Sequence, residues 1–343
     1  MLKPGLVIAQ KYQIEHLIAE GGMAELYLAR CLSEVSPHEF VAIKRLIPAL
    51  RNIDSHVESF YREARYIITL RSHHIVKGLE LVDEASELLL IMEYILGPQI
   101  SHVGLILKKQ SLNLRIKVAL GVALGIAKAL KVIRDWPLED GHKLDLVHGD
   151  ISGQNIILSI DGQIKLVDFG VAITASKQQG SENDLLRGTM RYMSPEQRQG
   201  KPLTQASDIY SLALVLEEVI QEEFNMHELS AIIKRAKACD LKIRYASADE
   251  LLADLEKFSL NFGAWDPQAF LCKVLENQPQ SIRRRPSIFM TRLVSLTTAL
   301  VLIGALVVAT GTRYFYPRIP DLGLDDHHCE NYSEDLLVGA SNL

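Results

Sequence analysis

The chain has 343 residues, of which 48% are hydrophobic and 23% charged, and its net charge is −5 at pH 7. This composition allows a large buried core and excludes a chain that is disordered throughout. A general nucleic-acid binder would carry a basic surplus, so the charge argues against nucleic acid as a partner. The four cysteines are widely scattered without C-x-x-C or zinc-ligand spacing, so we expect structural thiols in a reduced compartment.

The first third of the chain is strand-rich. It begins without the basic and long apolar segments of a signal peptide. Residues 12–48 alternate apolar and polar around the glycine turn "EGGMAE", which predicts three strands. Residues 55–70 have the spacing of an amphipathic helix, and strand-like runs return at 79–95. The apolar face of the predicted helix consists of Val57, Phe60, Ala64, Ile67 and Leu70.

From residue 96 the pattern becomes helical, most clearly at 112–133. Four basic residues interrupt this apolar run, so we interpret it as a core helix rather than a membrane span. The predicted fold class is therefore α+β, with a β-rich N-terminal lobe at about 12–95 and a helical C-terminal lobe at about 96–257.

Residues 293–312 form an uncharged run of 20 residues, which as a helix would be about 30 Å long and match a bilayer core. Arginines precede this run, whereas residues 313–343 form a short acidic tail. The positive-inside tendency then predicts a single-pass protein of the cytoplasmic membrane, with the N-terminal part in the cytoplasm and the tail outside. The basic juxtamembrane segment 258–292 suits anionic lipid as a partner.

The clearest chemical motif is "VHGDISGQN" (147–155), followed 13 residues after its last Asn by the Asp of "DFG". The spacing H-x-D-x-x-x-x-N and then D-F-G is typical of phosphoryl-transfer sites. Such a site needs a carboxylate to orient the acceptor hydroxyl and further ligands for a metal ion. Asp150 is the candidate for the first role, and Asn155 and Asp168 are candidates for the second.

A cation must also hold the nucleotide phosphates. Lys44 ends the strand-like motif "FVAIK", and Glu63 lies 19 residues later on the buried side of the predicted helix. A Lys44–Glu63 pair would keep the ammonium pointed at the phosphates. The hairpin "IAEGGMAEL" (18–26) is similar to a glycine-rich phosphate-covering loop, although only the central glycine, Gly21, stands at its expected position.

Three further segments resemble protein kinases. "RGTMRYMSPEQ" (187–197) matches the end of an activation segment, "ASDIYSLALVLEEV" (206–219) is similar to a central kinase helix, and Arg244 stands where the family pairs an arginine with Glu196. The chain is identified as resembling a bacterial eukaryotic-like serine/threonine protein kinase over about residues 12–257. The resemblance implies a bilobal kinase fold, ATP and Mg²⁺ as cofactors, and protein substrates.

By the same resemblance, Asp150, Lys44 and Glu63 are catalytic and Asn155 and Asp168 bind the metal. The nucleotide is expected to contact Ile18, Ala19, Glu20, Gly21, Gly22, Met23, Ala24, Glu25, Leu26, Lys44, Glu93 and Ile95.

Some residues depart from the family pattern. Gly149 replaces the usual Arg that reads a phosphate on the activation loop, and Ser152 replaces the usual Lys. The segment between "EEVIQ" and "ELSAIIKRA" is too short for the family's substrate-docking helix. Two alternatives therefore stay open: a membrane-tethered pseudokinase scaffold, and a small-molecule phosphotransferase of the aminoglycoside or choline kinase type. The substrate, the signal and self-association are also left open.

Overall fold

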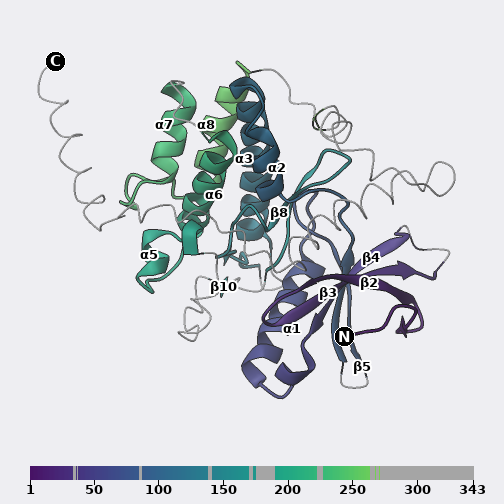
Figure 1. Ribbon diagram of the computed structural model, residues 1–343. Coiled ribbons are helices and arrows are strands. Elements are labelled where there is room, and N and C mark those ends of the chain that lie inside the picture. The colour runs from purple at the N-terminus through teal and green to yellow at the C-terminus, as the bar shows by residue number, and fades with distance from the viewer. Residues whose placement is uncertain are drawn as a thin grey trace, which may run out of the picture. The chain divides into compact units, whose positions relative to one another are not determined.

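A computed structural model of the chain describes residues 1–33, 36, 38–84, 87–137, 141–169, 173–174, 190–221, 227–262, 267 and 270. All of them belong to the first of the chain's two units, Met1–Thr298. They form a β-rich N-lobe, drawn in purple, and a helical C-lobe, drawn in blue to green (Figure 1), so the predicted α+β bilobal fold is confirmed.

The N-lobe is built on one six-stranded antiparallel sheet with the order β1-β2-β3-β4-β6-β5. The strands predicted within 12–48 and 79–95 are confirmed, and the short β1 is an edge strand that the sequence pattern does not reveal. Since side chains alternate between the faces of a strand, Tyr27 and Ile91 pack on one face of the sheet, and Ala42 and Leu90 on the other. The strands are β1 (Val7–Ile8), β2 (Tyr12–Glu20), β3 (Ala24–Cys31), β4 (Phe40–Leu46), β5 (Gly78–Glu84) and β6 (Glu87–Glu93).

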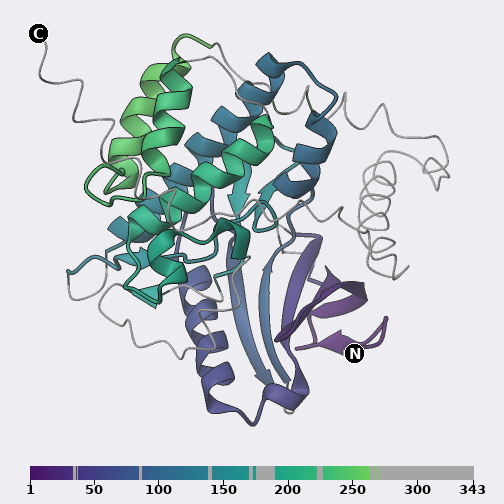
Figure 2. The ribbon, with the colours of Figure 1, turned by 60° about the vertical axis from the view of Figure 1, so that its left-hand side comes forward.

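One helix, α1 (Asp54–Thr69), packs against this sheet, after a short 3-10 helix, η1 (Pro48–Leu50). Figure 2 shows α1 running alongside the long strands. Its predicted apolar face is confirmed, since Phe60, Ala64 and Ile67 are buried on the sheet. Glu63 is buried among them, so this face presents one carboxylate toward the interior.

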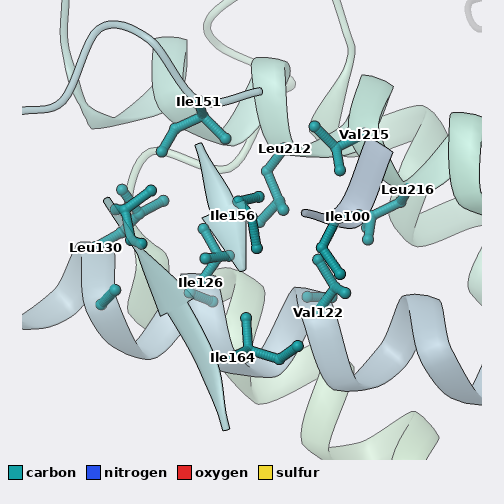
Figure 3. Close-up of a cluster of buried hydrophobic side chains, with 14 of the residues drawn as sticks. Ile100, Val122, Ile126, Leu130, Ile151, Ile156, Ile164, Leu212, Val215 and Leu216 are labelled. Atoms are coloured by element: carbon teal, nitrogen blue, oxygen red, sulfur yellow. The ribbon is translucent and has the colours of Figure 1, made fainter. Parts of the chain in front are cut away.

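The C-lobe surrounds the long helix α3 (Leu112–Asp135), which confirms the predicted core helix. Figure 3 shows side chains of α3, α6, β8 and β9 meeting in this core. Of the basic residues on this helix, Arg115 is buried and donates to the carbonyl of Ile220 at 2.9 Å. The other C-lobe helices are α2 (Ile100–Leu107), η2 (Met190–Tyr192), α5 (Pro195–Arg198), α6 (Gln205–Ile220), α7 (His227–Ala236) and α8 (Ala248–Ser259).

Four short strands position the phosphoryl-transfer motifs. The "HGDISGQN" loop runs from β7 (Leu146–Val147) to β8 (Ile156–Leu158), and β8 pairs with β9 (Ile164–Leu166). Asp168 follows β9 by two residues, so this pairing brings the two motifs together. The strand β10 (Ile173–Thr174) pairs with β7.

The two lobes are joined by backbone pairing as well as by the linker after β6. The amide of Val76 donates to the carbonyl of Leu166 at 2.9 Å, and the amide of Leu166 donates to the carbonyl of His74 at 2.9 Å. The larger of the two hydrophobic clusters contains residues of both lobes, from Leu46 on β4 to Leu255 on α8.

Several predictions concern the C-terminal part of the chain. Only residues 221–226 separate α6 from α7, which confirms that this connection is short. The predicted span 293–312 and the acidic tail lie outside the described residues. Among the residues that are described, no helix is both long enough and apolar enough to cross a bilayer. The expectation of structural thiols is wrong for Cys239, which is disulfide-bonded, whereas Cys31 is a free thiol.

Candidate active site

Three charged residues meet between the lobes. Lys44 on β4 donates from its Nζ to Oε1 of Glu63 at 2.6 Å and to Oδ1 of Asp168 at 2.9 Å. The Lys44 and Glu63 side chains are 17% and 4% exposed, whereas that of Asp168 is 48% exposed. The predicted Lys44–Glu63 pair is therefore present, and it is joined by the acid of the D-F-G motif.

The electrostatics of this cluster favour a charged lysine. Burial alone would lower the pKa of Lys44, but the carboxylates of Asp168 and Glu63 outweigh burial and raise it. Burial raises the pKa of Glu63 to about 7, against the attraction of Lys44. Lys44 therefore stays an ammonium at neutral pH and presents a positive charge beside the partly exposed Asp168.

The second half of the site is the loop between β7 and β8. The side-chain amide of Asn155 donates from Nδ2 to the Asp150 carbonyl at 2.9 Å and to Oδ2 of the Asp150 carboxylate at 2.8 Å. The carbonyl of Asn155 accepts from the amide of Val167 at 2.9 Å, immediately before Asp168. These bonds fix the positions of Asp150, Asn155 and Asp168 relative to one another, as the motif spacing predicts.

Packing between two rings, those of His148 and Phe169, also holds the catalytic loop and the D-F-G motif together. The rings of His148 and Phe169 meet edge to face, with their centroids 4.8 Å apart, and both side chains are buried. Burial lowers the pKa of His148 to about 4, so this imidazole is neutral at pH 7. His148 is therefore a packing and positioning residue rather than a proton carrier.

The loop backbone is anchored by side chains that the motif analysis does not assign. The two carboxylate oxygens of Asp208 accept from the amides of His148 and Gly149, each at 2.8 Å. Nε2 of Gln197 donates to the Gly149 carbonyl at 2.8 Å. No local sequence pattern reveals these contacts, because Gln197 lies 48 residues from Gly149, and Asp208 lies 59 residues from Gly149 and 60 from His148.

The predicted phosphate-covering loop is the turn between β2 and β3. Glu20, Gly21 and Gly22 are exposed, and the amide of Gly21 closes the turn onto the carbonyl of Ala24 at 2.9 Å. Leu26 on β3 lies opposite Lys44 on β4. The loop thus lies at the end of the hairpin next to the strand that carries the lysine.

The side chain of Glu25, another predicted nucleotide contact, points away from Lys44. Its carboxylate is buried on the opposite face of the sheet from Lys44, where it accepts from Arg45 at 2.8 Å and from the hydroxyl of Tyr27 at 2.6 Å. The cause is the strand period of two, which turns Glu25 and Leu26 to opposite faces. Only its backbone remains as a predicted nucleotide contact.

Two predicted nucleotide contacts, Glu93 at the end of β6 and Ile95 just after it, lie where the lobes join. Oε1 of Glu93 accepts from the amide of Lys77 at 2.8 Å and from Nζ of Lys165 on β9 at 2.6 Å. The Glu93 side chain therefore connects the lobes, which leaves its backbone for the nucleotide. Ile95 is half-buried and packs against the larger hydrophobic cluster. Ile18, Ala19 and Met23 complete the predicted set around the turn.

The oxygen atoms of the site suit a magnesium ion that is bound together with the nucleotide, rather than a metal ion held by protein side chains alone. In the described part of the chain, no three His, Cys, Asp or Glu side chains gather into a metal-binding group. Magnesium in phosphoryl-transfer sites is usually held by one or two protein oxygen ligands together with substrate phosphates and water. The partly exposed carboxylate of Asp168 and the amide oxygen of Asn155 supply ligands of this kind.

The segment that follows D-F-G ends at α5, where Glu196 forms the predicted ion pair with Arg244. This pair is buried. The guanidinium of Arg244 donates from NH1 and NH2 to the two oxygens of Glu196 at 2.7 and 3.2 Å. Ser207 on α6 also donates to Glu196, at 2.7 Å. This pair connects α5 to the loop before α8. Residues 170–172 and 175–189 lie outside the described part.

The fold and the site define a protein kinase. The sequence profile of the protein kinase domain matches residues 12–291, and the chain belongs to this family. More specifically, its relatives are bacterial protein kinases of the eukaryotic-like type. The kinase domain of Mycobacterium tuberculosis PknI superposes with a TM-score of 0.56 at 21% identity, over 76% of this chain and all of that domain, which shows the shared fold.

Two relatives illustrate the range of the family. Tyrosine-protein kinase MasK of Myxococcus xanthus is 31% identical over 75% of this chain and 40% of MasK. Serine/threonine-protein kinase PrkC of Bacillus subtilis is 31% identical over 63% of this chain and 31% of PrkC. The match therefore spans less than half the length of these relatives.

Proposed function

We propose that the chain is an ATP- and Mg²⁺-dependent protein kinase that transfers the γ-phosphoryl group to serine or threonine hydroxyls of proteins. The observation that carries this proposal is the joint placement of Lys44, bonded to both Glu63 and Asp168, and Asp150, held by Asn155. A scaffold that only binds other proteins has no chemical need for all five residues.

Each residue has a separate task in this proposal. The bound nucleotide with its magnesium ion supplies the phosphoryl group and neutralises the charge that develops on it. Lys44, kept charged by its two carboxylate neighbours, donates to the nucleotide phosphates. Asp168 and Asn155 provide metal ligands. Asp150 accepts a hydrogen bond from the acceptor hydroxyl and orients its oxygen toward the phosphorus.

The acceptor is proposed to be a protein because the chain has the elements that follow D-F-G in protein kinases. The Glu196–Arg244 pair anchors the end of that segment next to the catalytic loop. A small-molecule phosphotransferase needs the catalytic loop but not this anchored segment. The short α6–α7 connection still separates this chain from relatives with a docking helix, so we expect substrates to bind mainly beside the catalytic loop.

The test is phosphate transfer to the full chain itself and to a generic protein substrate, with magnesium and ATP. Asp150→Asn should keep nucleotide binding and lower turnover by roughly 10²–10⁴, the usual contribution of a positioned base. Asp168→Asn should also weaken magnesium-dependent nucleotide binding. Asp249→Asn, in an exposed ion pair at the start of α8, is the matched control and should retain activity.

The outcomes separate the alternatives. Transfer to an aminoglycoside or to choline, without transfer to protein, would make the chain a small-molecule phosphotransferase. Nucleotide binding without any transfer would make it a pseudokinase. Phosphoamino-acid analysis should find phosphoserine or phosphothreonine. Phosphotyrosine alone would instead place this chain with its relative MasK, which is named a tyrosine-protein kinase.

We further propose that the kinase is anchored in the cytoplasmic membrane and acts in signalling. The domain predicted at 12–257 would face the cytoplasm, followed by the juxtamembrane segment predicted at 258–292, a span at 293–312 and an outer tail at 313–343. Phe258 and Phe270 belong to the larger hydrophobic cluster, so the folded domain continues past residue 257 and only the later part of 258–292 is proposed to lie against the membrane. The support is the uncharged 20-residue run and the arginines before it. A single span also confines copies to the plane of the bilayer, which favours self-association. A topology reporter fused after Leu343 should be active only outside; cytoplasmic activity would contradict this arrangement.

A further inference from the structure

The feature that carries a further inference is the glycine between His148 and Asp150. Gly149 has a φ of +77°, in the left-handed region that favours glycine. A glycine has more conformational freedom than any other residue, so contacts from outside the loop help to hold it in one conformation. Within the loop, the Asp150 amide donates to Nδ1 of His148 at 3.3 Å. The peptide plane that follows Gly149 ends in the amide of Asp150, so its orientation, together with the bonds from Asn155, sets where the Asp150 carboxylate points.

Both backbone groups of Gly149 are bound by buried side chains. Its amide donates to Oδ1 of Asp208 at 2.8 Å, and its carbonyl accepts from Nε2 of Gln197 at 2.8 Å. Asp208 is 1% exposed and Gln197 is 5% exposed. Asp208 on α6 therefore holds the peptide before Gly149, and Gln197 on α5 holds the peptide after it.

Gln197 is itself held in place. Its amide donates to the hydroxyl of Ser194 at 3.3 Å, which caps the short helix α5. Its neighbour Glu196 is bonded to Arg244 and Ser207 in the buried ion pair described above. The side-chain amide of Gln197 is thus presented to the catalytic loop by an element that is anchored independently of that loop.

We propose that Gln197 is a positioning residue for phosphoryl transfer, which fixes the Gly149–Asp150 peptide and through it the Asp150 carboxylate. This inference rests on the proposed kinase function. The side chain of Gln197 acts only through Gly149. Its loss should therefore affect turnover, while the nucleotide contacts of Lys44 on the other lobe stay intact.

The experiment compares Gln197→Leu with Gln205→Leu in the full chain. Gln205 is a matched control: it is also a buried glutamine, and its Nε2 donates to the carbonyl of Leu130 at 2.8 Å, away from the catalytic loop. Gln197→Leu should lower kcat by about 10–100-fold, the range expected for a displaced catalytic group, with nucleotide affinity and KM for ATP within about twofold. Gln205→Leu should destabilise the protein but keep kcat within about twofold of the parent.

A third variant tests the donated hydrogen bond itself. Gln197→Glu has the same length, but its ionised carboxylate cannot donate to the Gly149 carbonyl. Because position 197 is buried and faces the Gly149 carbonyl, the pKa of the new carboxyl should be raised well above its ordinary value. The kcat relative to the parent should therefore be low at pH 8 and should rise as the pH is lowered to 6 and the carboxyl becomes protonated. A kcat ratio that does not change with pH would contradict a role for the donated bond.

Amide hydrogen exchange supplies a readout that does not depend on activity. The Asp150 amide shares its peptide plane with the Gly149 carbonyl and donates to Nδ1 of His148 at 3.3 Å. Release of this plane in Gln197→Leu should break that bond and speed exchange of the Asp150 amide at least about tenfold, whereas Gln205→Leu should keep the parent rate. If the parent transfers no phosphate, the proposed function fails. Exchange of the Asp150 amide then tests by itself whether Gln197 holds the Gly149–Asp150 peptide. Unchanged exchange in Gln197→Leu, or a kcat loss equal to that of Gln205→Leu, would overturn the inference.

Discussion

Replacing Arg244 with Met should cost more stability than any exposed ion pair in the C-lobe. The guanidinium side chain is fully buried, and besides Glu196 it donates to the carbonyls of Ala238 at 2.7 Å and Ala206 at 3.1 Å. Methionine keeps most of the apolar volume of the side chain but removes every one of these donors. Glu196 would then keep only the hydroxyl of Ser207 as a bonded side-chain partner among those described here.

The size of the stability loss follows from the Glu196 carboxylate, which stays buried without its partner. Burial alone would raise the pKa of Glu196, but the bonds from Arg244 and Ser207 hold it below its ordinary value. Removing one partner of such a buried pair costs about 3–5 kcal/mol. This is a large part of the roughly 5–15 kcal/mol that stabilises a typical domain. For a domain of this size it corresponds to a fall in Tm of about 6–20 °C.

The assay is urea unfolding of the parent, Arg244→Met, Glu196→Gln and the double variant. The double variant should be destabilised by less than the sum of the single variants, because it no longer buries an unpaired charge. Lys237→Met is the control, because its ion pair with Glu217 is exposed and is expected to contribute about 1 kcal/mol or less. A loss for Arg244→Met no larger than that of Lys237→Met, or strict additivity in the double variant, would refute the reasoning.

Two further predictions concern the catalytic loop. Gly149→Ala should lower the free energy of unfolding by about 1–2 kcal/mol, because its φ of +77° strains any residue with a Cβ; unchanged urea midpoints would contradict this. Burial raises the pKa of Asp208 from its ordinary 3.8 to about 7, although two amides donate to it. Since the folded-state pKa lies above the unfolded one, its stabilising contribution is full below about pH 4 and is lost as the pH rises through 7. Between pH 5 and pH 8 the parent should therefore lose stability relative to Asp208→Asn by up to about 3 kcal/mol; a constant difference would argue against a buried, titrating carboxyl.

The sequence predicts the Lys44–Glu63 and Asp150–Asn155 pairs because each depends on a pattern within a short stretch of chain. Helical periodicity alone places Glu63 on the buried face of α1, toward the strand that ends near Lys44. The motif spacing brings Asp150 and Asn155 close to Asp168, and the strand pair β8–β9 is the physical reason. The orientation of Glu25 could have been predicted from strand alternation, since Leu26 shares a face with Lys44 and Glu25 does not.

The contacts that sequence reasoning misses join segments far apart in the chain. The bond from Gln197 to Gly149 and those from Asp208 to the loop amides depend on how α5 and α6 pack, and no local pattern encodes that packing. The edge strand β1 is missed for a different reason. Its two residues are too few to display a period, and its pairing with β2 depends on the neighbouring strand.

The pairing of residues 74–76 with β9 has a consequence for how the kinase folds. The Val76–Leu166 and His74–Leu166 backbone bonds, and a hydrophobic cluster that contains residues of both lobes, make the N-lobe and the C-lobe parts of one cooperative unit. Division of the gene between β6 and α2 would leave each half with unpaired backbone groups and exposed apolar surface. The halves should therefore recover structure only when they are expressed together.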